Sequence, residues 1–75
     1  MIISKSDLLP GAVFTFITAG NERVIDLIIG VRYHRCHILR MFYNKIGIDS
    51  IEHQTHDLDI LASAYDSIVV DIQKL

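Results

Sequence analysis

Residues 12–31, AVFTFITAGNERVIDLIIGV, contain the clearest structural signal of the chain: two strand-forming stretches separated by a turn. Residues 12–19 are rich in β-branched and aromatic side chains, which favour an extended backbone. Gly20 and Asn21 tolerate positive φ angles, so the chain can reverse there and form a second strand over residues 23–31. We therefore predict a hairpin of two antiparallel strands.

The second strand of this hairpin has two unequal faces, because successive side chains of a strand point in opposite directions. One face carries Asp26 between two apolar residues, whereas the other carries Ile25, Leu27 and Ile29. The face without a charge is the better candidate for the core. We predict that Ile25, Leu27 and Ile29 point into the protein interior.

The rest of the chain predicts three more strands and one helix. Strands are expected over residues 36–43, 46–56 and 67–73, with reversals near His34 and Arg35 and at residues 44–45. Leu58, Leu61, Ala62 and Tyr65 recur at helical spacing. Asp57 is a suitable N-cap, so we expect one short helix within residues 57–65 and none longer. Residues 4–11, SKSDLLPG, predict a lead-in with a turn.

The composition predicts one small domain over residues 1–75, since 51% of the residues are apolar and 21% are charged. Five short strands with a helical turn before the last one close most economically as a small, mainly β barrel. This order of elements resembles the SH3-like small β-barrels, and the resemblance implies a five-stranded barrel. A short chain with one cysteine and no catalytic motif also resembles accessory proteins of tailed bacteriophages. That resemblance implies a regulatory module that acts on a host protein.

Bulk properties predict a cytoplasmic protein with no membrane association. Cys36 is the single cysteine, so no disulfide can form within the chain and a reducing cytosol is favoured. We find no export signal and no apolar run long enough for a membrane span. The net charge is −2, but residues 1–45 carry six basic and three acidic side chains, and residues 46–75 carry one basic and six acidic. This asymmetry can steer an encounter with a charged partner.

The sequence gives no support for an enzyme, a metal site or a cofactor. Four histidines and one cysteine are present, but no C-x₂-C or H-E-x-x-H motif occurs. On a strand, His37 would point away from Cys36, so it could not act as the base for a thiol nucleophile. The histidines are interpreted as surface residues and Cys36 as half-buried. Glycine-rich nucleotide-binding loops are also missing from the sequence.

The segment Arg32–Lys45 is the strongest candidate binding region, because basic and aromatic residues alternate there. Arg, Tyr and Phe are enriched at the centres of protein interfaces. We predict a non-catalytic interaction module that docks on a protein partner and can also form a homo-oligomer, since the chain has more apolar residues than a small core needs. The predicted binding residues are Arg32, Tyr33, Arg35, Arg40, Phe42 and Tyr43.

Two other interpretations of residues 32–45 remain open from sequence. If Arg32, His34, Arg40 and Phe42 share an outward face, they could bind a nucleic acid by phosphate contacts and base stacking. The acidic second half of the chain opposes strong nucleic-acid affinity. In the third interpretation, the arginines form a solvated edge. The core is then filled by Tyr33, Leu39, Met41 and Tyr43.

Overall fold

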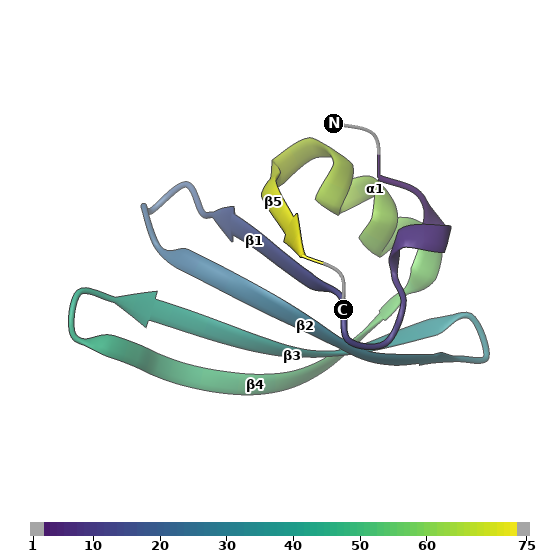
Figure 1. Cartoon of the computed structure of the whole chain (residues 1–75), viewed down its shortest axis with the longest axis horizontal. Helices are drawn as coiled ribbons and strands as arrows, with labels where there is room; N and C mark the ends of the chain where they lie inside the picture. Colours follow the sequence, from purple (N-terminus) through teal and green to yellow (C-terminus); the bar gives the residue numbers. More distant parts are fainter. Residues whose placement is uncertain (1–2, 74–75) are drawn as a thin grey trace.

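A computed structural model of the chain describes residues 3–73 as one antiparallel sheet with a helix packed on one face (Figure 1). The strand order is β4-β3-β2-β1-β5. In chain order the elements are the 3₁₀ turn η1 (Lys5–Asp7), β1 (Val13–Ile17), β2 (Arg23–Arg32), β3 (Arg35–Asn44), β4 (Gly47–Asp57), α1 (Leu58–Ile68) and β5 (Val69–Gln73).

The predicted hairpin and the five predicted strands are confirmed. Asn21 adopts a φ of 63° in the first turn, and its N–H donates to the carbonyl of Thr18 over 3.0 Å. Strand β1 pairs with β2 on one side and with β5 on the other, so the last strand returns to the first. Strands β4 and β5 form the two edges of the sheet, and the sheet is not closed. The mainly β fold therefore agrees with the prediction, but a closed barrel is not seen.

Helix α1 begins where the sequence predicts and ends later. Asp57 Oδ1 accepts a hydrogen bond from the N–H of Ile60 over 3.0 Å, which caps the first turn. The expectation that the helix ends by residue 65 is wrong, because α1 continues to Ile68. Residues 66–68 contain neither Gly nor Pro, so the sequence has no residue that would stop the helix there.

The core lies between α1 and one face of the sheet, which we call the covered face. Phe14, Val24 and Ile38 point from three strands toward Leu61 and Tyr65 of α1. Because residues of one strand alternate between faces, Ile25 and Leu27 point away from α1. Ile29 lies in an irregularity of the β2–β3 register and is 46% exposed. The predicted core face of β2 is therefore wrong, and the face that contains Asp26 is the buried one.

The opposite side of the sheet, which we call the open face, includes three rows of side chains that lie across the strands. The helical elements within residues 3–73 are η1 and α1. They contact each other, and they contribute to the core or flank it on the covered side. From β1 to β4, the rows of the open face are Val13–Leu27–Leu39–His53, Thr15–Ile25–Met41–Ile51 and Ile17–Arg23–Tyr43–Ile48.

Candidate functional site: the tip of the β2–β3 hairpin

The turn between β2 and β3 consists of Tyr33 and His34, and its backbone is unusual for these residue types. Their φ angles are 52° and 61°. A two-residue turn with two positive φ angles is usually made by Asn-Gly or a similar pair, because a larger side chain is strained there. Each residue held in such a region costs about 1 kcal/mol or more. The hairpin therefore keeps two side chains at its tip at the expense of stability.

The conformation of His34 has a structural reason, because this residue ties the turn to the start of α1. Its carbonyl oxygen accepts a hydrogen bond from the N–H of Leu58 over 3.0 Å. Its Nε2 lies 2.8 Å from Asp59 Oδ2, and Lys5 Nζ lies 3.2 Å from the other oxygen of Asp59. The hydrogen bond with His34, followed by that with Lys5, lowers the pKa of Asp59. These contacts fix the orientation of the tip relative to the helix.

Tyr33 is held differently, since its side chain is directed into solvent. The residue is 86% exposed, and the Arg32 guanidinium carbon lies 5.2 Å from the centroid of its ring. A cation over an aromatic face is attracted to it, but weakly at an exposed site. The positive φ of Tyr33 thus directs an aromatic ring into solvent, and no burial of the ring offsets its conformational cost.

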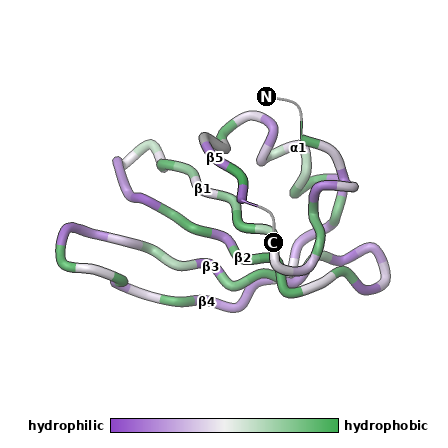
Figure 2. The backbone as a smooth tube through the Cα atoms, in the orientation of Figure 1, coloured by the Kyte–Doolittle hydropathy of each residue, from purple (hydrophilic) through white to green (hydrophobic). Residues whose placement is uncertain are grey.

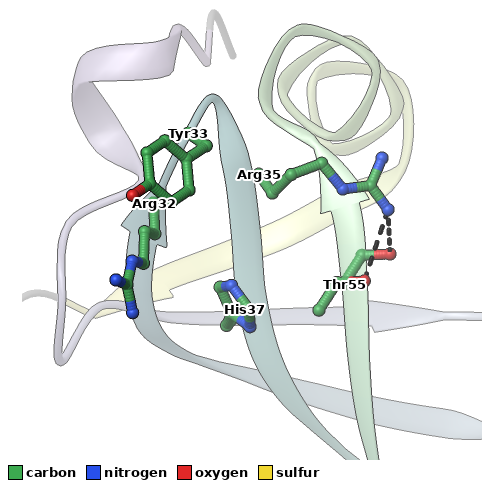
Figure 3. A pocket seen from close by; sticks show the side chains of 5 residues that line it. All are labelled: Arg32, Tyr33, Arg35, His37 and Thr55. Atoms are coloured by element: carbon green, nitrogen blue, oxygen red, sulfur yellow. Dashed lines mark hydrogen bonds between the residues drawn. The ribbon is translucent and has the colours of Figure 1, made fainter.

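Two arginines flank the turn and oppose each other across the hairpin. Arg32 and Arg35 are direct partners in the β2–β3 register, and like charges at such positions are destabilising. Arg35 Nη2 donates to the carbonyl oxygen and to Oγ1 of Thr55, over 3.2 and 3.3 Å (Figure 3). Within residues 3–73, neither arginine forms an ion pair with a carboxylate. Asp57 opposes Arg35 on β4, but its Oδ1 caps α1.

A shallow hollow of about 290 Å³ lies at this end of the sheet. Its lining consists of Arg32, Tyr33, Arg35, His37 and Thr55. Figure 3 shows Arg32 and Arg35 on either side of the hairpin, with His37 farther along β3 between them. The hydropathy colouring marks this end of the sheet as hydrophilic (Figure 2). We call Arg32, Tyr33 and Arg35 the Arg–Tyr tip. This site offers two guanidinium groups and one ring to a ligand that carries negative charge.

The six predicted binding residues do not form one surface. Arg32, Tyr33 and Arg35 meet at the tip, whereas Arg40 and Phe42 point to the covered face and Tyr43 lies on the open face at the other end of β3. The condition for the nucleic-acid interpretation, an outward face shared by Arg32, His34, Arg40 and Phe42, is therefore not met.

The interpretation that places Tyr33, Leu39, Met41 and Tyr43 in the core is also wrong. Tyr33 is exposed, and the other three residues lie half-buried on the open face. Periodicity separates the two faces of β3 correctly, but it cannot identify which face α1 covers.

Arg40 belongs to a buried polar cluster that the sequence did not reveal. Its Nε and Nη2 donate to the two oxygens of the fully buried Asp26 over 2.9 and 2.8 Å. Tyr65 Oη donates to Asp26 Oδ2 over 2.5 Å. The hydrogen bond with Asp26 raises the pKa of Arg40, and burial is the largest cause of the raised pKa of Tyr65. The cluster joins sheet to helix, with Asp26 fully buried and the Arg40 side chain 21% exposed.

The thiol of Cys36 is not arranged for catalysis. Cys36 is fully buried rather than half-buried, and burial followed by the charge of Asp26 raises its pKa to about 11. A nucleophilic cysteine requires the opposite shift. His37 points to the other face of β3, where its ring stacks on that of His53 with centroids 5.7 Å apart. On the covered side, burial followed by the charge of Arg40 lowers the pKa of His56.

His34, Asp57 and Asp59 place ligand atoms within 4.8 Å of one another at the start of α1. Each of these side chains already has a protein partner: His34 and Asp59 pair with each other, and Asp57 caps the helix. The geometry is explained by these contacts without an ion.

A second hollow, of about 430 Å³, lies at the other end of the sheet between the β1–β2 and β3–β4 turns. Its charged lining residues are Glu22, Arg23 and Lys45, so opposite charges are mixed there. Asn21, which has a positive φ in one of these turns, is a residue type that tolerates it. This end therefore lacks the combination of strain and uncompensated charge that marks the Arg–Tyr tip.

Comparison with known proteins gives no match: no protein-family model, no curated protein and no solved structure is similar to this chain. Among the described residues, no helix has the length and apolar character needed to cross a membrane.

Proposed function

We propose that this chain is a non-catalytic interaction module whose Arg–Tyr tip docks on an acidic segment of a protein partner. The observation that carries the proposal is the conformation of Tyr33, which keeps a positive φ of 52° while 86% of the residue is exposed. Backbone strain of this kind persists where the surroundings impose it, and it concentrates at binding sites. The fold we propose is an open relative of the SH3-like small barrels, since β5 follows the helix and returns to β1.

The chemistry of the tip suits a carboxylate-bearing ligand. A guanidinium group binds a carboxylate through two parallel hydrogen bonds, and its planar fork requires little reorganisation. Arg32 and Arg35 have no ion pair within residues 3–73, and Arg35 has further donors besides the Nη2 that bonds to Thr55. A carboxylate placed between them would also relieve the repulsion of two like charges in direct register.

Tyr33 supplies the second part of the recognition. Tyrosine and arginine are the residues that most often dominate the energy of protein interfaces, because they bury large areas with few rotatable bonds or with directional hydrogen bonds. Contact with the ring would add apolar burial to the charge pairing. A partner with an acidic residue beside an apolar one fits this arrangement.

A protein partner is favoured over a nucleic acid by where the other basic residues lie. Arg40 is engaged by Asp26, and Lys45 lies at the opposite end of the sheet. The two free cations at the tip therefore do not continue into a track along a phosphate backbone. The net charge of −2 also opposes binding to a polyanion.

The test compares two triple variants of the full chain. Arg32→Ala/Tyr33→Ala/Arg35→Ala removes the tip, while Arg23→Ala/Lys45→Ala/Ile46→Ala removes two cations and an exposed apolar residue from the opposite end. Binding is measured on an array of synthetic peptides that carry Glu or Asp beside varied apolar residues. The recognised peptides are then titrated by NMR.

We expect the tip variant to lose peptide binding, the control variant to keep it, and the shifts to centre on residues 32–35. Binding that survives in the tip variant would overturn the proposal. A single-stranded oligonucleotide is titrated in parallel at low and high salt. If the oligonucleotide binds, its binding requires the tip and weakens steeply with salt, and no peptide binds, then the nucleic-acid interpretation would replace the proposal.

A further inference from the structure

We infer that the open face of the sheet is covered by the open face of a second copy of this chain, so that two sheets pack face to face in a homodimer. The Arg–Tyr tip lies at the charged end of this face, since Arg32 and Arg35 follow the same strand alternation, but dimerisation through the apolar rows stands or falls independently of the proposed docking function. It rests on the composition of the open face, on its area and on the size of the chain.

The centre of the open face is apolar and contains no Asp, Glu, Lys or Arg on β1 to β4. Its first central row holds three aliphatic residues and a histidine, and its second holds Thr15 with Ile25, Met41 and Ile51. On β2 the apolar pair Ile25 and Leu27 points outward, while the charged Asp26 is buried.

The central side chains on β1 to β3 are half-buried, and side chains toward the rim of the face are more exposed. Ile17, Ile48 and Ile51 are 49%, 52% and 58% exposed. Isolated apolar residues are ordinary on protein surfaces, but a contiguous patch of this extent marks an interaction site. Charged residues of the face lie outside its two central rows on β1 to β4: Arg23 is in the outer row, Asp71 is on the edge strand β5, and Arg32 and Arg35 are at the tip.

The area of the face is sufficient for a stable dimer. Five strands spaced about 4.8 Å apart, with about eight residues at about 3.3 Å each, give a face of about 650 Å². Two such faces bury about 1,300 Å², within the range of about 1,200–2,000 Å² that stable interfaces bury. A broad surface formed by sheet residues fits another sheet, as in two-layer β-sandwiches whose sheets pack about 10 Å apart.

A second copy is the occupant that the small size of the chain favours. A domain of 75 residues buries a modest share of its surface, and chains of this length often gain stability from disulfides, metals or oligomerisation. Its lone Cys36 is buried and free, so no disulfide strengthens the described fold. The face is suited to self-association, since twofold packing can place its apolar centre on the apolar centre of the second copy.

The experiment measures the mass of the full chain by size exclusion with light scattering and by sedimentation, from about 1 to about 500 μM. We expect twice the chain mass of 8.5 kDa at the higher concentrations. Two variants place a lysine on the open face: Ile51→Lys on edge strand β4, and Ile25→Lys on the internal strand β2, whose cross-strand partners Thr15 and Met41 carry no charge. The matched control, Ile60→Lys, changes an isoleucine that is 68% exposed on α1.

Both open-face variants should weaken dimerisation at least about tenfold, because each puts two unpaired lysines per dimer into an apolar interface. The control Ile60→Lys should leave the dimerisation constant unchanged. Circular dichroism verifies that each variant is folded. The inference is overturned if the wild type is a monomer at every concentration, or if the dimer persists in both open-face variants. It is also overturned if Ile51→Lys alone weakens the dimer, because that result would indicate pairing along the β4 edge. The tip variant should remain dimeric, so loss of peptide binding and loss of the dimer are distinguishable.

Discussion

Arg40 holds the fully buried Asp26 across the β2–β3 register, through two parallel hydrogen bonds of 2.9 and 2.8 Å. The pair occupies the covered face, where the sheet meets α1. Its Asp26 also accepts the Tyr65 hydroxyl, so the carboxylate has three donors. This cluster makes the charged face of β2 the inner one.

Removing one member of the pair should destabilise the fold strongly. Arg40→Met leaves Asp26 buried without its cation, so we expect a loss of about 3–5 kcal/mol in the free energy of unfolding, measured with urea. The triple variant Asp26→Leu/Arg40→Met/Tyr65→Phe removes every charge and hydroxyl of the cluster and should lose less than the single variant. A loss below about 1 kcal/mol in Arg40→Met would show that the pair does not form as described.

Tyr65→Phe isolates the hydroxyl from the ring. The phenylalanine keeps the stacking on Phe14, whose centroid lies 4.5 Å away, but cannot donate to Asp26. We expect a loss of about 1–3 kcal/mol in unfolding free energy, because the buried carboxylate loses a donor. Tyr33→Phe is the control, since Tyr33 is exposed, and should change stability by less than about 0.5 kcal/mol.

Tyr33→Asn should stabilise the protein while it weakens docking. Asparagine tolerates the φ of 52° better than tyrosine does, so we expect a gain of about 1 kcal/mol in thermal or urea unfolding. Arg32→Asn, at the end of β2 and outside the residues with positive φ, should give no such gain. Unchanged or reduced stability in Tyr33→Asn would argue against strain in the turn.

Asp57→Ala tests the cap of α1. The variant removes the acceptor for the Ile60 N–H, so we expect a loss of about 1 kcal/mol, while Asp57→Asn should retain most of the stability. Measurements at neutral pH compare both variants with wild type. Equal losses in the two would point to the charge of Asp57 rather than to the cap.

Cys36 should be inert at neutral pH and should make stability fall in alkali. Its folded pKa of about 11 lies above the ordinary value of 9.0, so below pH 9 both states keep the proton and no dependence arises. Between pH 9 and 11 the unfolded state alone loses the proton, and stability falls as pH rises.

The raised pKa of Tyr65 acts in the same direction, so the variant Cys36→Ala is needed to isolate the thiol. Its unfolding free energy should fall less steeply over this pH range than that of wild type. Thiol alkylation of wild type at pH 8 should be slow and should accelerate in urea. Rapid alkylation without urea would contradict the burial of Cys36.

The strands, the first turn and the start of the helix could be predicted from the sequence, because they depend on neighbouring residues. Alternating β-branched residues produced the strands, Gly20 and Asn21 produced the first turn, and Asp57 the start of the helix. These signals are local, so they can be read without knowing the fold. The three predicted site residues that meet at the tip are also close in sequence, at positions 32–35.

Which face of the sheet is buried could not be predicted from the sequence, because it depends on contacts between residues far apart in the chain. Alternation separated Ile25 and Leu27 from Asp26, and hydrophobicity favoured the wrong face. The inner position of Asp26 depends on Arg40 and Tyr65, which lie 14 and 39 residues away in the chain. A buried charge is tolerated when hydrogen-bonding partners surround it. Strand register and helix placement bring these partners together, and no local sequence pattern encodes either of them. The same strand register places Ile25 and Leu27 on the open face of the sheet.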